Sequence, residues 1–111
     1  MARCTFAAVW EFSVKPAFKE QFEEVYGPDG DWAILFNKSP GYLGTSLLSS
    51  VESQAIYVTI DRWISREAFA HFKQAHQDEY KALDQKCEGF TESERSLGSF
   101  QEIVTKEKAN G

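Results

Sequence analysis

The centre of the chain constrains the fold more than any other part. The segment Pro40-Gly41-Tyr42-Leu43-Gly44-Thr45 opens a strand that we expect to span about 42–49, and an alternating pattern predicts a second strand over 55–62. The polar residues 51–54 between them suit a hairpin connection. Ser65 then has the position of a helix N-cap, with Glu67 in the first turn. The sequence therefore predicts a β-hairpin that leads directly into a helix.

The flanking segments repeat this alternation of strand and helix. Residues 4–14 alternate with period two, as in a strand, and Lys15-Pro16 ends that pattern and suits a helix start. Apolar residues recur at helical spacing up to Tyr26, the turn Gly27-Pro28-Asp29-Gly30 follows, and 31–36 is predicted as a short helix. A long helix is expected over about 66–86, a loop over 88–95 and a last strand over 97–104. Residues 105–111 are expected to form a polar tail outside the domain core of 4–104.

The order β, α, β, β, α, β predicts the α+β class. We expect one domain over 1–111 with a ferredoxin-like βαββαβ fold. The fold class implies a four-stranded antiparallel sheet with the helices on one face. From right-handed crossovers we further expect strands one and three to lie side by side and parallel, with strands two and four at the edges. The other face of the sheet has no helix to cover it, so a second copy of the chain is the simplest cover. The expected assembly is a homodimer.

Composition excludes several classes of partner. The 111 residues carry 12 Lys and Arg against 17 Asp and Glu, a formal charge of −5, which disfavours nucleic acid and anionic lipid. No apolar stretch is long enough to span a bilayer, and the first residues lack the features of a secretory signal. We therefore expect no nucleic-acid and no membrane partner, and a cytoplasmic location. Cys4 and Cys87 are expected to be free thiols, and no metal site is expected because paired ligands at short spacing are missing.

His76 is the candidate catalytic residue. It lies in the apolar stripe of the predicted helix over 66–86, between Phe72 and Tyr80, and so is expected to point toward the sheet. A partly desolvated imidazole there could accept a proton from a phenolic or anthrone-like substrate, and the resulting carbanion could react with oxygen. The competing interpretation is a core histidine that is hydrogen-bonded to a neighbour or to water. We predict a pocket beside it, because water is its simplest partner.

Aromatic side chains are numerous, and several could stack against a flat substrate or simply pack in the core or a dimer contact. The candidate substrate-binding residues are Trp63, Phe72, Tyr80 and Trp10. Glu11 and Asp61 are assigned to the sheet face of the dimer, where Arg62 or Arg95 could pair with a carboxylate. No Ser or Thr has a candidate general base at a sequence spacing that would indicate a catalytic pair, so the sequence does not support a nucleophilic hydrolase.

Three segments carry a resemblance to a known family. They are Trp10-Glu11-Phe12-Ser13-Val14-Lys15-Pro16, Pro40-Gly41-Tyr42-Leu43-Gly44-Thr45, and Trp63-Ile64-Ser65 with Glu67-Ala68-Phe69. Over about 4–104 the chain resembles the antibiotic biosynthesis monooxygenase family of the dimeric α/β-barrel superfamily. The resemblance implies a homodimer with an apolar cavity between sheet and helices, and, in some members, oxidation of polycyclic aromatic compounds by molecular oxygen with no metal or flavin cofactor.

Other members of the family open the haem ring, and here the sequence departs from their pattern. Those relatives use an Asn on the first strand, where this chain has Glu11. The positions that correspond to their Trp and His hold Phe72 and Ala82. The hypothesis is therefore a cofactor-independent monooxygenase that oxidises a small aromatic or polyketide-like substrate with O2. The alternative is a non-catalytic dimeric module that binds a small apolar ligand or a protein partner.

Overall fold

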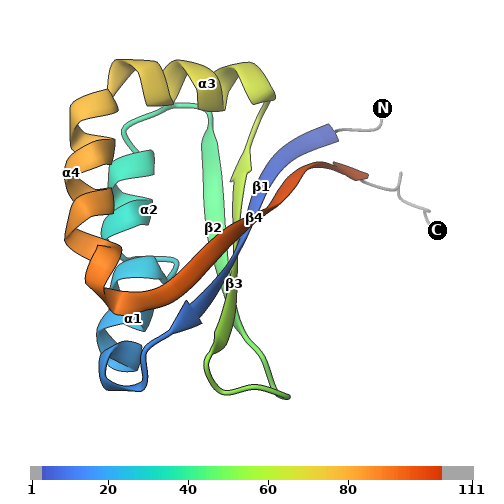
Figure 1. Ribbon diagram of the computed structural model, residues 1–111. Helices are drawn as coiled ribbons and strands as arrows, with labels where there is room; N and C mark the ends of the chain where they lie inside the picture. Colours follow the sequence, from blue (N-terminus) through green and yellow to red (C-terminus); the bar gives the residue numbers. More distant parts are fainter. Residues whose placement is uncertain (1–3, 104–111) are drawn as a thin grey trace.

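The computed structural model describes residues 4–103, apart from the side chain of Cys4. The predicted order of elements is confirmed, and Figure 1 shows the helices gathered on one side of a strongly twisted sheet. The strands are β1 (Cys4–Val14), β2 (Tyr42–Ser49), β3 (Ile56–Trp63) and β4 (Thr91–Ile103). The helices are α1 (Lys19–Tyr26), α2 (Asp31–Phe36), α3 (Arg66–Ala75) and α4 (Gln77–Cys87), with short 3₁₀ turns at Pro16–Phe18 and Glu88–Phe90. The predicted tail over 105–111 lies outside the described residues.

The sheet has the strand order β2-β3-β1-β4, so the two central and two edge strands are those expected. The expectation that β1 and β3 run parallel is wrong, since the two strands pair antiparallel, with Trp10 opposite Thr59 and Ala8 opposite Asp61. The physical reason is the β2–β3 hairpin, which reverses the chain direction after the first crossover. Every neighbouring pair in the sheet is antiparallel as a result.

The core lies between the sheet and the helices and is largely aromatic. The ring centroids of Phe22 and Tyr26 on α1 are 4.2 Å apart, and Phe12 on β1 lies 5.0 Å from Tyr26. Trp63 and Phe72 form a second group with Phe36, at centroid distances of 5.3 to 5.4 Å. Stacked and edge-on aromatic pairs of this kind add to the stability that burial provides. None of the helices described is long and apolar enough to cross a membrane.

The opposite face of the sheet carries no described helix (Figure 1). Its central strand presents Ile56, Val58 and Ile60, which are half-buried, and the edge strands add Leu48 and Phe100, each about half exposed. The predicted ion pair on this face is confirmed, because Arg95 Nε donates to Glu11 Oε1 at 2.6 Å. This face is apolar at its centre and charged toward its β4 side.

The single long helix predicted over 66–86 is wrong, because the chain breaks into α3 and α4 at His76. This residue has φ −120° and ψ 36°, although its backbone N–H still donates to the carbonyl of Phe72 and its carbonyl accepts from Tyr80. The segment contains no Gly or Pro, so the sequence gives no usual signal for a break. As Figure 1 shows, α3 lies across one end of the sheet and α4 runs down its side.

The last strand begins earlier than predicted. Residues 91–95, expected as part of a loop, already pair with β1, where Thr91 faces Val14 and Arg95 faces Glu11. The pairing register shifts between Val9 and Trp10, and Gly98 beside this shift has φ +119°. A backbone at this φ favours glycine, so the sequence supports the bulge locally.

Candidate functional site: an aromatic cavity with a buried carboxyl group

A partly open cavity of about 450 Å³ lies between the sheet and the helices. Its wall is formed by residues from three strands, β1, β3 and β4, and from all four described helices. The lining residues are Trp10, Phe12, Tyr26, Trp32, Phe36, Thr59, Asp61, Lys73, Tyr80, Asp84 and Glu94. Its volume is in the range of cavities that hold small organic ligands.

Six of the lining residues are aromatic, and they enclose the cavity from several sides. The ring of Tyr80 on α4 meets that of Trp32 on α2 edge-on at 5.0 Å between centroids. Trp10 and Phe12 come from β1, with near-parallel rings 6.4 Å apart. Flat, polarisable walls of this kind suit a planar aromatic ligand.

A hydrogen-bonded carboxyl group, that of Asp61, lines this cavity from the central part of the sheet. Asp61 on β3 is opposite Ala8 on β1 and opposite Thr45 on β2. Thr45 donates from Oγ1 to Asp61 Oδ1 at 2.7 Å, and the Tyr42 hydroxyl lies 2.5 Å from the same Oγ1. Tyr42, Thr45 and Asp61 therefore form a hydrogen-bonded row that ends at the cavity.

Burial raises the pKa of Asp61 to about 6, and the hydrogen bond from Thr45 opposes this shift. Desolvation penalises the charged carboxylate, while a hydrogen bond to it favours that form. A carboxyl group with a pKa near 6 is ionised at neutral pH and is a stronger base than an ordinary aspartate. Such a group is suited to accept a proton from a bound ligand.

Charged side chains lie toward the helix and β4 side of the cavity. Lys73 on α3 has its Nζ 5.1 Å from the centroid of the Tyr80 ring. Asp84 on α4 and Glu94 on β4 are exposed at their surfaces. Desolvation, with the charges of Asp84 and Glu88, raises the pKa of Glu94, and burial with nearby carboxylates raises the pKa of Tyr80 to about 12.

His76 is not among the residues that line this cavity. Its side chain is 28 % exposed at the junction of α3 and α4, and its Nδ1 lies 2.7 Å from Glu79 Oε1. The Phe72 ring packs beside the imidazole at 5.1 Å. The neighbour that bonds the imidazole is thus the carboxylate of Glu79, one turn further along the chain.

The four candidate substrate-binding residues separate into two pairs. Trp10 and Tyr80 line the cavity, as the hypothesis requires. Trp63 and Phe72 are 0 % and 1 % exposed and belong to the packed core outside the cavity wall. The Trp63 indole N–H finds no hydrogen-bond partner among the described residues.

Asp61 is the functional candidate that the sequence reasoning assigned to the wrong face. It projects toward the helices and not toward the open face of the sheet, together with the buried residues Tyr57, Thr59 and Trp63. The signal was present in the sequence, because this alternating set carries the two large aromatic residues of the strand. The branched aliphatic set Ile56, Val58 and Ile60 looked more core-like but faces outward. Lys73, Asp84 and Glu94 carried no sequence signal as cavity residues.

Cys87 is a free and buried thiol, as expected, and burial raises its pKa. The expectation for Cys4 falls on a side chain outside the described residues. Among the residues described, no three His, Cys, Asp or Glu side chains are arranged as a metal-binding group.

Comparison with solved structures supports the fold. A mutant of SnoaB, a cofactor-independent oxygenase from Streptomyces nogalater, is 20 % identical, with a TM-score of 0.71 over 96 % of this chain and 98 % of that one. A candidate antibiotic biosynthesis monooxygenase from Bordetella bronchiseptica is 21 % identical, with a TM-score of 0.69 over 92 % of this chain and 100 % of that one. A similar candidate from Nitrosomonas europaea is 17 % identical, with a TM-score of 0.60 over 96 % and 94 %.

Comparison with curated proteins gives no match. Residues 5–83, which include β1 to β3, α1 to α3 and the first half of α4, match the family described as antibiotic biosynthesis monooxygenase. Because this match covers well over half of the sequence, and the fold agrees with it, the chain belongs to the antibiotic biosynthesis monooxygenase family.

Proposed function

We propose that this protein is a cofactor-independent monooxygenase that oxidises a small aromatic, polyketide-like compound with molecular oxygen in the cavity beside Asp61. The observation that carries the proposal is a hydrogen-bonded carboxyl group in the wall of an aromatic cavity. Membership of the family and the likeness to a cofactor-independent oxygenase support the reaction class.

The proposed reaction begins with proton transfer to Asp61. Its carboxylate accepts a proton from an acidic C–H of the substrate, which leaves a delocalised carbanion between the aromatic walls. The carbanion transfers one electron to O2, and the substrate radical and superoxide combine into a peroxide. The peroxide anion takes back the proton held by Asp61 and becomes a hydroperoxide. Asp61 then removes the second proton from that carbon, the O–O bond breaks as the ketone forms, and the departing hydroxide takes this proton and leaves as water. For anthrone, the balance is anthrone plus O2 to anthraquinone plus water.

Oxidation should rise with pH through the titration of Asp61. The base form of a carboxyl group with a pKa of about 6 predominates above that pH, so activity on anthrone should fall as the pH is lowered through 6. The measurement is oxygen uptake and anthraquinone formation from pH 5 to 8, after subtraction of the protein-free rate. Equal consumption of O2 and formation of anthraquinone is expected. A rate no higher than the protein-free rate, with anthrone still bound, would favour the non-catalytic ligand-binding module instead.

The open face of the sheet supports the proposal of a homodimer. Ile56, Val58 and Ile60 form an apolar centre that a second copy of the chain can cover. Light scattering at micromolar concentration should give twice the mass of one chain, and Val58→Glu should give a monomer because the charge would be buried. Val51→Glu, at a 98 % exposed position in the hairpin turn, is the matched control. A wild-type monomer whose stability does not depend on dilution would contradict the proposal.

A further inference from the structure

The charges on the cavity wall carry information about the ligand. Three carboxyl groups, those of Asp61, Asp84 and Glu94, line the cavity against a single ammonium group, that of Lys73. Within residues 4–103, no Lys, Arg or His nitrogen lies within 4 Å of any of these three carboxyl groups, whereas Glu11 and Glu102 are paired with arginines. Negative charge therefore exceeds positive charge around the aromatic walls.

Lys73 does not neutralise this excess directly. Its Nζ lies between two rings, 5.4 Å from the centroid of Phe69 and 5.1 Å from that of Tyr80, where a cation is attracted by the aromatic faces. Lys73, Tyr80 and Asp84 also border a second, outer hollow between α3 and α4, so they form the boundary between this hollow and the cavity. A ligand that enters along this boundary meets the carboxylates and the aromatic faces together.

We infer that the ligand of this cavity is an aromatic compound that carries a basic nitrogen, bound as the ammonium form near Asp84 and Glu94. The ammonium group would be held by these carboxylates and by the face of Trp10, while the aromatic nucleus lies against the inner wall near Asp61. Planar aromatic compounds with a carboxylate in place of the nitrogen are disfavoured by the same charges. The inference narrows the substrate class of the proposed oxygenase, but it concerns binding, and its test needs no turnover.

The test compares three naphthalene probes of similar size and different charge by isothermal titration calorimetry. They are 1-naphthylmethylamine, the neutral 1-naphthylmethanol and the anionic 1-naphthoate, none of which is an anthrone-type substrate. We expect the amine to bind about tenfold more tightly than the alcohol at pH 7.5 and low salt, and the acid to bind more weakly than the alcohol. Equal affinities for amine and alcohol, or tightest binding of the acid, would overturn the inference.

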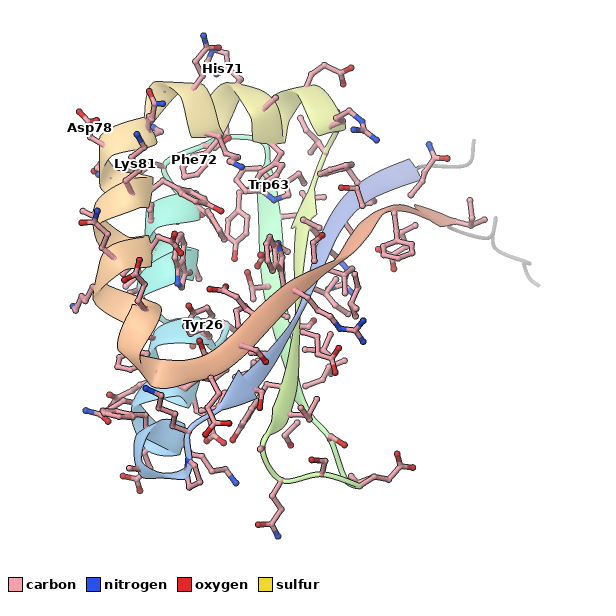
Figure 2. All side chains as sticks on the ribbon, in the orientation of Figure 1. Tyr26, Trp63, His71, Phe72, Asp78 and Lys81 are labelled. Carbon is pink, nitrogen blue, oxygen red and sulfur yellow. The ribbon has the colours of Figure 1, made fainter. Side chains whose placement is uncertain are left out.

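Substitutions that remove either negative or positive charge from the cavity wall show where the preference for the amine arises. The double variant Asp84→Asn and Glu94→Gln should bring the amine-to-alcohol ratio close to one, whereas Lys73→Gln should raise it. The matched control is the double variant Asp78→Asn and Glu52→Gln, which also removes two negative charges, one from the exposed outer side of α4 (Figure 2) and one from the exposed hairpin connection. A ratio that falls equally in the control would show a long-range effect of net charge and would contradict the proposed site. The altered side chains are exposed, and circular dichroism checks the fold of each variant.

Proton linkage provides a second readout. The titratable groups in the cavity wall are Asp61, Asp84, Glu94, Lys73, Tyr26 and Tyr80, and Lys81 in the outer hollow and Glu88 near Glu94 add one charge of each sign. The pKa values of Asp61 and Glu94 lie above the ordinary carboxyl range, so an ammonium ion beside them lowers these values and releases protons on binding. Amine binding should therefore strengthen between pH 5 and 7.5, with proton release in calorimetry, while alcohol binding stays constant. The opposite order would contradict the inference even if the protein proves not to oxidise anthrone.

Discussion

Replacement of Asp61 by Asn should lower the rate of anthrone oxidation by about 10²- to 10⁴-fold, the usual contribution of a general base. The amide keeps the shape of the carboxyl group and can still accept the hydrogen bond from Thr45, but it cannot take a proton from the substrate. Oxygen uptake at pH 7.5 measures the loss. Binding of a non-reactive aromatic probe should be retained, because the cavity wall is otherwise unchanged.

Thr45 separates a positioning effect from a general loss of structure. Thr45→Val removes the hydrogen bond that lowers the pKa of Asp61, so the acid limb of the pH–rate profile should move to higher pH. Thr45→Ser keeps a hydroxyl group and should restore the wild-type profile. A variant that only destabilised the sheet would have a lower rate, but the acid limb of its pH–rate profile would stay at the wild-type pH.

His76 provides the contrasting experiment, since its role as base stays a prediction of the sequence. Its imidazole is partly exposed and bonded to Glu79, so we expect His76→Phe to keep most of the oxidation rate. If His76→Phe abolishes oxidation and Asp61→Asn does not, the proton acceptor is the histidine and the assignment to Asp61 is wrong.

Trp63→Ala should have the largest effect on stability, a loss of about 3–5 kcal/mol in the free energy of unfolding. The indole is fully buried, and its ring lies within 5.3 Å, centroid to centroid, of Phe36, Tyr42, Phe69 and Phe72. Truncation leaves a void that these neighbours from three different elements, α2, β2 and α3, cannot fill together. Urea unfolding followed by circular dichroism measures the loss, and Val51→Ala at the exposed turn is the neutral control.

Trp63→Phe distinguishes a core residue from a wall of the binding site. Phenylalanine keeps most of the apolar volume and removes an N–H that has no partner among the described residues, so the loss should be much smaller than for alanine. Probe affinity should change little in this variant. A large loss of affinity with wild-type stability would return Trp63 to the substrate-binding group.

Local patterns in the sequence were sufficient for the elements and their neighbours. Alternation predicted β1 and β3, and the Pro and Gly turns separated α1 from α2 where the structure separates them. The relative direction of β1 and β3 was predicted incorrectly, because it depends on how many times the chain reverses direction between these two strands. The face of β3 was also misassigned, since branched aliphatic and aromatic residues are both apolar, and only packing against α1 and α3 decides between them.

The candidate site was predictable only in part, for a similar reason. Trp10 and Tyr80 are aromatic residues on faces that the patterns assigned to the interior, and they reach the cavity. Asp61 owes its properties to a hydrogen bond from another strand and to burial by helices far away in sequence. His76 sits where a helical stripe predicts an inward side chain, but a local contact with Glu79 accompanies a break that periodicity cannot show.

That break determines the geometry of the enclosure. An unbroken helix over the predicted 66–86 would extend about 30 Å in one direction, at 1.5 Å per residue, and could cover only one side of the sheet. The bend at His76 sets α3 and α4 at an angle to each other (Figure 1). Lys73 before the bend and Tyr80 after it therefore line one cavity from two adjacent helices. A shift of this elbow would change the spacing of the two walls, and with it the volume between them, while the sheet and its strand register stay as they are.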